Sequence, residues 1–150
     1  MRICYRKLEE SDKEEVVAMI QAFYEEDMSG KRKAKEQVYK SLEAFEKHPD
    51  YGSVTVFTAE EIIVGYCIIV HFYSNEYGGM MLYIDELYVV PEYRGKGIAT
   101  DFIRQLRGNN EIDCVAMKLE VLPYNTKAFK LYERLGFVES DRSYMMLRNV

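Results

Sequence analysis

The sequence has few of the residues from which disulfides, metal centres and histidine-dependent catalytic triads are built. Its three cysteines, Cys4, Cys67 and Cys114, are odd in number and far apart, so they predict neither a disulfide framework nor a metal site. We interpret them as reduced core residues of a cytoplasmic protein. The two histidines, His48 and His71, lack metal-ligand spacing. The expected chemistry therefore uses neither a metal nor a histidine triad.

Long apolar runs and blocks of like charge are also missing. No run approaches the ~18 apolar residues of a membrane span, and the first ten residues, MRICYRKLEE, have no apolar core of a signal peptide. The net charge is -5 and no basic arm is present, which argues against non-specific binding of nucleic acid. We expect one soluble, cytoplasmic domain over residues 1–150, without internal repeats.

One stretch organises the rest of the chain. Residues 82–90 are strand formers, Pro91 follows, and the loop Arg94-Gly95-Lys96-Gly97-Ile98-Ala99 leads into apolar residues at 99, 102, 103 and 106. That last spacing is the apolar face of a helix. A strand, a glycine-containing turn and a helix bring several backbone N–H groups to the positive end of the helix, where an anion can bind. The sequence therefore predicts a phosphate site.

The loop fits neither of two well-known phosphate-binding patterns. Gly95 and Gly97 are followed by Thr100 where a dinucleotide fingerprint has its third glycine, and no P-loop pattern is present. The remaining pattern, R-x-x-G-x-A from Arg94 to Ala99, resembles the acyl-CoA signature of the GNAT superfamily of N-acetyltransferases. A second block at residues 125–137, NTKAFKLYERLGF, resembles the other hallmark of that superfamily, N-x-x-A-x-x-x-Y-x-x-x-G-F.

The periodicity of the chain and this resemblance predict the same α+β fold. Strands are expected near 2–8, 53–59, 62–73, 80–90, 114–121 and 137–148, and helices near 12–27, 31–48, 98–107 and 125–135. The element order is β-α-α-β-β-β-α-β-α-β. The resemblance implies a mixed, mainly antiparallel twisted sheet with helices on both faces. It also implies that the sheet splays between the strands at 82–90 and 114–121.

The resemblance further implies that acetyl-CoA lies in this split. Its pyrophosphate would contact backbone N–H groups of the loop and the Thr100 hydroxyl, with Arg94 shaping the loop or reaching a phosphate. The pantetheine arm would pair with the central strand, and Asn125 would anchor it from the other side. Two structural alternatives stay open: the glycines can serve a tight turn, and Asn125 can cap its helix. The implied cofactor-binding residues are Leu87, Tyr88, Val89, Arg94, Gly95, Lys96, Gly97, Ile98, Ala99, Thr100 and Asn125.

The resemblance also implies direct attack of an amine on the thioester. A primary ammonium has a pKa near ~10.4, so a base or an acidic water chain must accept its proton. Glu86 is the first candidate for the base, and Asp85, on the opposite face by strand alternation, is the second. A backbone N–H near residues 87–89 would bind the oxyanion. Tyr132 is the candidate acid for the leaving thiolate, although a tyrosine on an apolar helix face can simply be a core residue.

The identity of the amine is less well defined by the sequence. The central stretch is similar to polyamine and aminoglycoside acetyltransferases, and the acidic residues 25–27 and Glu76 would suit a small cationic acceptor. Residues 25–27 can equally be a solvated helix end. Alternatives are a protein lysine or N-terminal acetyltransferase, a catalytically silent acyl-CoA-binding or regulatory domain, and a nucleotide-binding module. A homodimer is common in the superfamily, but no sequence feature establishes one.

Overall fold

The computed structural model describes residues 1–27, 31–109 and 113–149 of the 150-residue chain. Its internal contacts divide the chain into two compact units, residues 1–120 and residues 121–150. The expectation of one domain over the whole chain stays a prediction.

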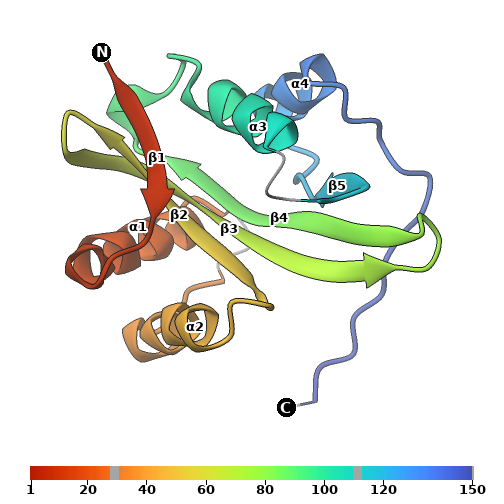
Figure 1. Cartoon of the computed structure of the whole chain (residues 1–150), viewed down its shortest axis with the longest axis horizontal. Helices are drawn as coiled ribbons and strands as arrows, with labels where there is room; N and C mark the ends of the chain where they lie inside the picture. Colours follow the sequence, from red (N-terminus) through yellow and green to blue (C-terminus); the bar gives the residue numbers. More distant parts are fainter. Residues whose placement is uncertain (28–30, 110–112, 150) are drawn as a thin grey trace. The chain divides into compact units, whose positions relative to one another are not determined.

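One five-stranded sheet forms the centre of the first unit (Figure 1). The strands follow one another across the sheet in chain order, with β1 to β4 antiparallel and β5 parallel to β4. Glu60 and Glu61, both with positive φ, make the tight turn between β2 and β3. The mixed, mainly antiparallel sheet is thus confirmed. The strands are β1 Ile3–Lys7, β2 Gly52–Ala59, β3 Ile62–Ser74, β4 Gly79–Val89 and β5 Ala116–Leu119.

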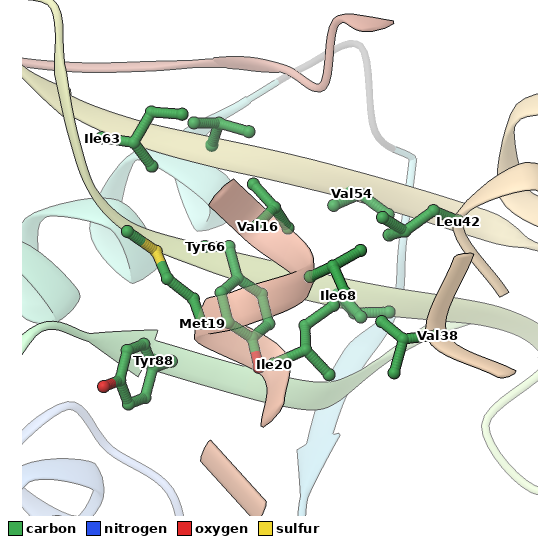
Figure 2. Packing of buried hydrophobic residues seen from close by; sticks show 12 residues of the cluster. Val16, Met19, Ile20, Val38, Leu42, Val54, Ile63, Tyr66, Ile68 and Tyr88 are labelled. Carbon is green, nitrogen blue, oxygen red and sulfur yellow. The ribbon is translucent and has the colours of Figure 1, made fainter. Parts of the chain in front are cut away.

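Helices α1 (Lys13–Glu25) and α2 (Lys35–Lys47) pack on one face of this sheet. Figure 2 shows the ring of Tyr66 from β3 among side chains of α1, including Val16 and Ile20. Burial of such apolar side chains is the main favourable term in folding. The apolar cluster contains Val16, Val17, Met19, Ile20, Val38, Leu42, Val54, Val56, Ile63, Tyr66, Ile68 and Tyr88.

Helix α3 (Ile98–Gly108) covers the opposite face, so helices lie on both faces as expected (Figure 1). Its Phe102 ring lies 4.8 Å from Phe57 of β2 and 5.3 Å from Tyr5 of β1. Phe57 and Val56 are adjacent in β2, and successive side chains of a strand point to opposite faces. Phe57 therefore packs against α3, whereas Val56 belongs to the apolar cluster under α1 and α2. The buried positions of α3 are Ile98, Phe102, Ile103 and Leu106, matching the predicted apolar face.

A β-bulge interrupts the central strand β4. Ile68 of β3 pairs with Glu86, whereas the next residue, Ile69, pairs with Ile84, so Asp85 is an extra residue without a cross-strand partner. A bulge shifts the side-chain alternation of its strand by one residue. Glu86 therefore shares the face of Ile68, which belongs to the cluster under α1 and α2. Regular strand alternation, on which the sequence prediction relied, does not include the bulge and so does not give the face on which Glu86 lies.

The sheet opens at the same point. Strand β5 pairs with β4 only from Met81 to Ile84, and no described residue continues the ladder on that side of β4 beyond Ile84. Strand β4 thus continues past the end of β5, and the predicted splay between the two strands stays a prediction. The expected strand over 114–121 is shorter in the structure, at Ala116–Leu119.

The second unit contains helix α4 (Thr126–Arg134), close to its predicted bounds. Gly136, with φ 99°, follows the helix, as expected for a C-terminal stop. The prediction of a strand over 137–148 is wrong, and the described residues 137–149 contain no strand. A strand needs a partner for its backbone groups, and this segment instead leaves Val138, Met145 and Leu147 about nine-tenths exposed.

The three cysteines are all free, and they differ in burial. Cys67 of β3 is buried and Cys114 is half-buried, but Cys4 is exposed. The prediction of a core position is therefore wrong for Cys4. Its strand, β1, forms the edge of the sheet, where one side chain in two faces away from the core.

Candidate active site

The loop between β4 and α3 has the backbone geometry that its glycines predict. After the single 3₁₀ turn Pro91–Tyr93, Gly95 and Gly97 adopt φ of 76° and 80°, the left-handed region that other residues avoid. A Cβ atom added at either glycine would meet no atom within 4 Å. The glycines are thus required by the turn, and the space beside them is open to a ligand.

The first turn of α3 presents backbone donors to this open space. The first intrahelical bond runs from Asp101 N to Gly97 O, 2.9 Å, so the N–H groups of Ile98, Ala99 and Thr100 have no acceptor within the helix. Lys96 and both glycines of the loop are exposed. This geometry suits an anion at the positive end of the helix, and the loop is not buried against the protein's own core.

The Tyr5 side chain of β1 makes hydrogen bonds to the first turn of α3. Its hydroxyl lies 2.9 Å from the Ile98 carbonyl oxygen and 2.9 Å from Asp101 Oδ2. Burial, and next the Asp101 carboxylate, raise the pKa of Tyr5, so the phenol stays protonated and can donate. The helix end that carries the donors is therefore fixed to β1.

Arg94 shapes the loop through contacts within the protein. Its Nε donates to the Val89 carbonyl oxygen at 2.7 Å, and Nη2 donates to both carboxylate oxygens of Glu26 at 2.8 and 3.0 Å. The guanidinium also lies over the Tyr88 ring, 5.3 Å from its centroid. Of the two roles expected for Arg94, the structure shows the first. Glu26, one of the three acidic residues at the end of α1, is paired and does not act as a free acidic lip.

The open edge of β4 presents backbone groups next to the bulge. Val90 N donates to Val64 O of β3, so alternation directs the groups of Leu87 and Val89 away from β3, toward the side on which no described strand pairs with this part of β4. Since Arg94 occupies the Val89 carbonyl, the N–H and C=O of Leu87 and the N–H of Val89 are the groups that can pair with a ligand along this edge.

Glu86 is a buried carboxylate, 7% exposed, held by two tyrosines. Tyr24 of α1 donates to Oε2 at 2.6 Å, and Tyr66 of β3 donates to Oε1 at 2.8 Å. Burial raises the pKa of Glu86, the two hydroxyls oppose this shift, the nearby Asp85 adds to it, and Lys33 lowers it. A carboxyl with a raised pKa is a stronger base than an ordinary glutamate.

Asp85 lies at the bulge and is exposed. The surrounding protein raises the pKa of its carboxyl, chiefly by partial desolvation and next by repulsion from Glu120. Asp85 is also close enough to Glu86 and Tyr24 to raise the pKa of both groups. Because Asp85 lacks the hydroxyl donors that Glu86 has, Glu86 is the more constrained of the two.

Three residues of this site were missing from the sequence prediction. Tyr24 and Tyr66 bind Glu86, and the Nζ atom of Lys33 lies 5.1 Å from the centroid of the Tyr24 ring. Their partners lie far away in the sequence, 62 residues for Tyr24 and 20 for Tyr66. The sequence signal for Tyr66 was only a polar tip in an apolar strand, and Lys33 lies in a generally charged segment.

The second unit contains the other two predicted residues. Asn125 precedes α4, and its Oδ1 accepts a hydrogen bond from Ala128 N at 3.3 Å, which is the capping role left open by the sequence. Tyr132 is half-buried on α4, and its ring packs edge-on against Phe137 at 5.7 Å. The roles of both residues toward acetyl-CoA stay predictions.

Across residues 1–27, 31–109 and 113–149, no helix is long and apolar enough to cross a membrane. The same ranges contain no group of three or more His, Cys, Asp or Glu side chains that could bind a metal ion.

The chain is similar to known proteins in both sequence and fold. Residues 17–137 match the acetyltransferase (GNAT) family. Thialysine N-epsilon-acetyltransferase of Mus musculus is 30% identical over 141 residues, covering 87% of this chain and 81% of that protein. A possible acetyltransferase from Clostridium difficile 630 has the same fold, with TM-score 0.86, 24% identity, and 100% and 99% of the two chains covered. An aminoglycoside N-acetyltransferase in complex with CoA has TM-score 0.80 and 18% identity over 99% and 96% of the chains.

Proposed function

Because the chain belongs to the acetyltransferase (GNAT) family and is thus an acetyl-CoA-dependent N-acetyltransferase, we propose that its acceptor is a small cationic primary amine. The observation that carries the proposal is the buried Glu86 carboxylate, bound by two tyrosine hydroxyls beside the opening of the sheet. A negative group and an aromatic face together favour an ammonium group.

The loop and the open strand edge fit the donor. Acetyl-CoA supplies an activated acetyl group as a thioester. The N–H groups of residues 95–99 and the Thr100 side chain would hold its pyrophosphate, since the left-handed glycines leave the space beside them open. The backbone of Leu87 and the N–H of Val89 would pair with the pantetheine arm, and the resemblance gives Asn125 a contact with the same arm.

Glu86 is the proposed base. The acceptor arrives as an ammonium with a pKa near ~10.4 and must lose a proton before its nitrogen can attack. Glu86 is only 7% exposed, so we assign the transfer to the Tyr24 hydroxyl, which accepts the amine proton as it passes its own to Glu86. Asp85 is the second candidate because it lies at the same bulge.

The proposed acid and oxyanion donor follow from the resemblance. Tyr132 would donate a proton to the departing thiolate, since a phenol with pKa about 10 can protonate a thiolate whose acid form has pKa ~8.5 when the two are in contact. The backbone N–H of Leu87 or Val89 would bind the developing oxyanion. These roles need no metal.

Two of the similar proteins support the choice of acceptor. The mouse relative is named for acetylation of thialysine at its Nε atom, and one protein of the same fold is an aminoglycoside N-acetyltransferase. Both names describe cationic amines. Carried over to this chain, they favour a small amine over a folded protein substrate.

An acceptor panel tests the proposal. Thiol release from acetyl-CoA is measured with thialysine, lysine, spermidine, an aminoglycoside and a lysine-containing peptide, on the native chain and on Glu86→Gln. We expect kcat/KM to be highest for one of the small amines and to fall by about 10²-fold in Glu86→Gln, the usual scale for loss of a general base. Acetylation of the peptide alone, or of no amine, would refute the proposal.

A further inference from the structure

The ammonium group of Lys33 lies at the place where the acceptor amine is proposed to bind. Its Nζ atom is 5.1 Å from the centroid of the Tyr24 ring, within the range of a cation–π interaction. The Gln21 side chain donates to the Lys33 backbone carbonyl oxygen at 3.3 Å and so ties this part of the chain to α1. The residue is half-buried.

The same ring connects Lys33 to Glu86. The Tyr24 hydroxyl donates to Glu86 Oε2 at 2.6 Å, and the Lys33 cation is near enough to Glu86 to favour its ionised form. The Lys33 ammonium thus lies over the face of a ring whose hydroxyl is bound to a carboxylate.

Other lysines are in different surroundings. Lys13 is bound to Glu10 and Glu46 at 2.6 Å each, and Lys47 lies 3.1 Å from Glu43. Lys35, at the start of α2, is exposed. Lys33 is therefore held by an aromatic face and not by the surface carboxylates that pair with Lys13 and Lys47.

We propose that Tyr24 and Glu86 form the ammonium subsite for the acceptor and that Lys33 is its resident competitor, which the acceptor must displace. The inference rests on the proposed function and adds a specificity-determining residue to it. A cationic acceptor gains the aromatic face and the carboxylate, but it must first move a like charge away from both. Lys33 thereby weakens the binding of cationic amines.

Equilibrium binding of 1,4-diaminobutane tests this inference without turnover. Calorimetry is performed on the full chain, with and without saturating CoA, for the native protein, Lys33→Met and Lys35→Met. Methionine keeps the length of the lysine stem without its charge, and Lys35→Met is the matched control because it removes one exposed lysine only two residues away. We expect Lys33→Met to bind the diamine about fivefold more tightly, the value that one exposed cation–π contact represents. Lys35→Met should bind it as the native chain does.

Removal of the ring gives the complementary test. In Tyr24→Leu the aromatic face is lost, so we expect diamine affinity to fall and the additional Lys33→Met change to produce no gain. Affinity in Lys33→Met that is unchanged or weaker, or an equal gain in Lys35→Met, would overturn the inference. The acceptor panel separates the two proposals: if native enzyme acetylates a small amine while Lys33→Met shows no gain, only the role of Lys33 fails.

Discussion

Tyr66→Phe removes one hydroxyl from the core and changes the candidate base without touching it. The Tyr66 side chain is fully buried, and its hydroxyl donates to Glu86 Oε1 at 2.8 Å. Phenylalanine fills the same space, so packing against the α1 cluster is preserved. What the change removes is a hydrogen bond to a charged acceptor, leaving Tyr24 as the remaining tyrosine donor to Glu86.

The size of the effect follows from that one bond. A hydrogen bond to a charged group contributes ~1.5–3 kcal/mol, and part of it survives when the carboxyl is protonated. With about 1.4 kcal/mol per pKa unit, the pKa of Glu86 should rise by about one unit in Tyr66→Phe. Because the base must be ionised, the acidic limb of the kcat/KM profile should move to higher pH by the same amount.

The pH dependence of the free energy of unfolding should also change in Tyr66→Phe. Glu86 has a pKa above its ordinary value in the folded protein, so the folded state binds more protons than the unfolded state between the two values. The free energy of unfolding therefore falls as pH rises through that interval, and Tyr66→Phe extends the interval upward. Urea unfolding at several pH values measures this.

A control variant isolates the cause. Tyr88→Phe alters another buried tyrosine, 5.9 Å from Tyr66 between ring centroids, whose hydroxyl interacts with Arg94. We expect no shift of the acidic limb in Tyr88→Phe. If Tyr66→Phe leaves the limb in place, or if Tyr88→Phe moves it equally, Glu86 is not the group that this limb reports.

Two other predictions concern the acid and the loop. Tyr132→Phe should lower kcat by about 10²-fold with an unchanged circular dichroism spectrum, and an unchanged kcat would remove Tyr132 from the mechanism. Gly97→Ala meets no steric obstacle but places a Cβ atom on a residue with φ 80°, so it should destabilise the loop by ~1 kcal/mol. We expect this variant to bind CoA more weakly in calorimetry. Gly108→Ala, at the end of α3, is the control and should leave CoA affinity unchanged.

Local patterns predicted most of the fold. The apolar spacing of residues 98–107 located α3, the β-branched run of residues 62–73 located β3, and Gly136 marked the end of α4. These signals succeed because period and turn chemistry act within a few residues. They also predicted the turn between β4 and α3, since its backbone conformation is set locally by Gly95 and Gly97.

Features that depend on distant partners were not predicted. Nothing near Glu86 in sequence indicates Tyr24 or Tyr66, and the pairing of Arg94 with Glu26 joins residues 68 positions apart. The apolar composition of residues 137–148 favoured a strand, but a strand also needs backbone partners that composition cannot supply. Side-chain partners of this kind are set by the packing of whole elements.

One extra residue in β4 produces both halves of the candidate site. If β4 alternated regularly through Asp85, Glu86 would share the face of Ile84, which pairs with Ile69 on the side opposite the α1 cluster, and Tyr24 could not reach its carboxylate. The same shift reverses which backbone groups face outward. Before the bulge, the carbonyl oxygen of the even-numbered Met80 faces outward and accepts a hydrogen bond from Val115 N. After the bulge, the carbonyl oxygen of the odd-numbered Val89 faces outward and accepts one from Arg94 Nε.

The bulge therefore sets both the direction of the Glu86 side chain and the backbone groups that β4 exposes at its open edge. Strand β5 stops pairing at Ile84, where the outward groups change register, so a ligand can occupy the continuing edge at residues 87 and 89. Deletion of Asp85 removes the extra residue but leaves Ile84 opposite Ile69 and Glu86 opposite Ile68, so Glu86 should still face Tyr24. We expect this variant to lose less thiol release from acetyl-CoA than Glu86→Gln does. Complete loss of turnover in a deletion protein with a native circular dichroism spectrum would show that Asp85 itself is needed for the reaction.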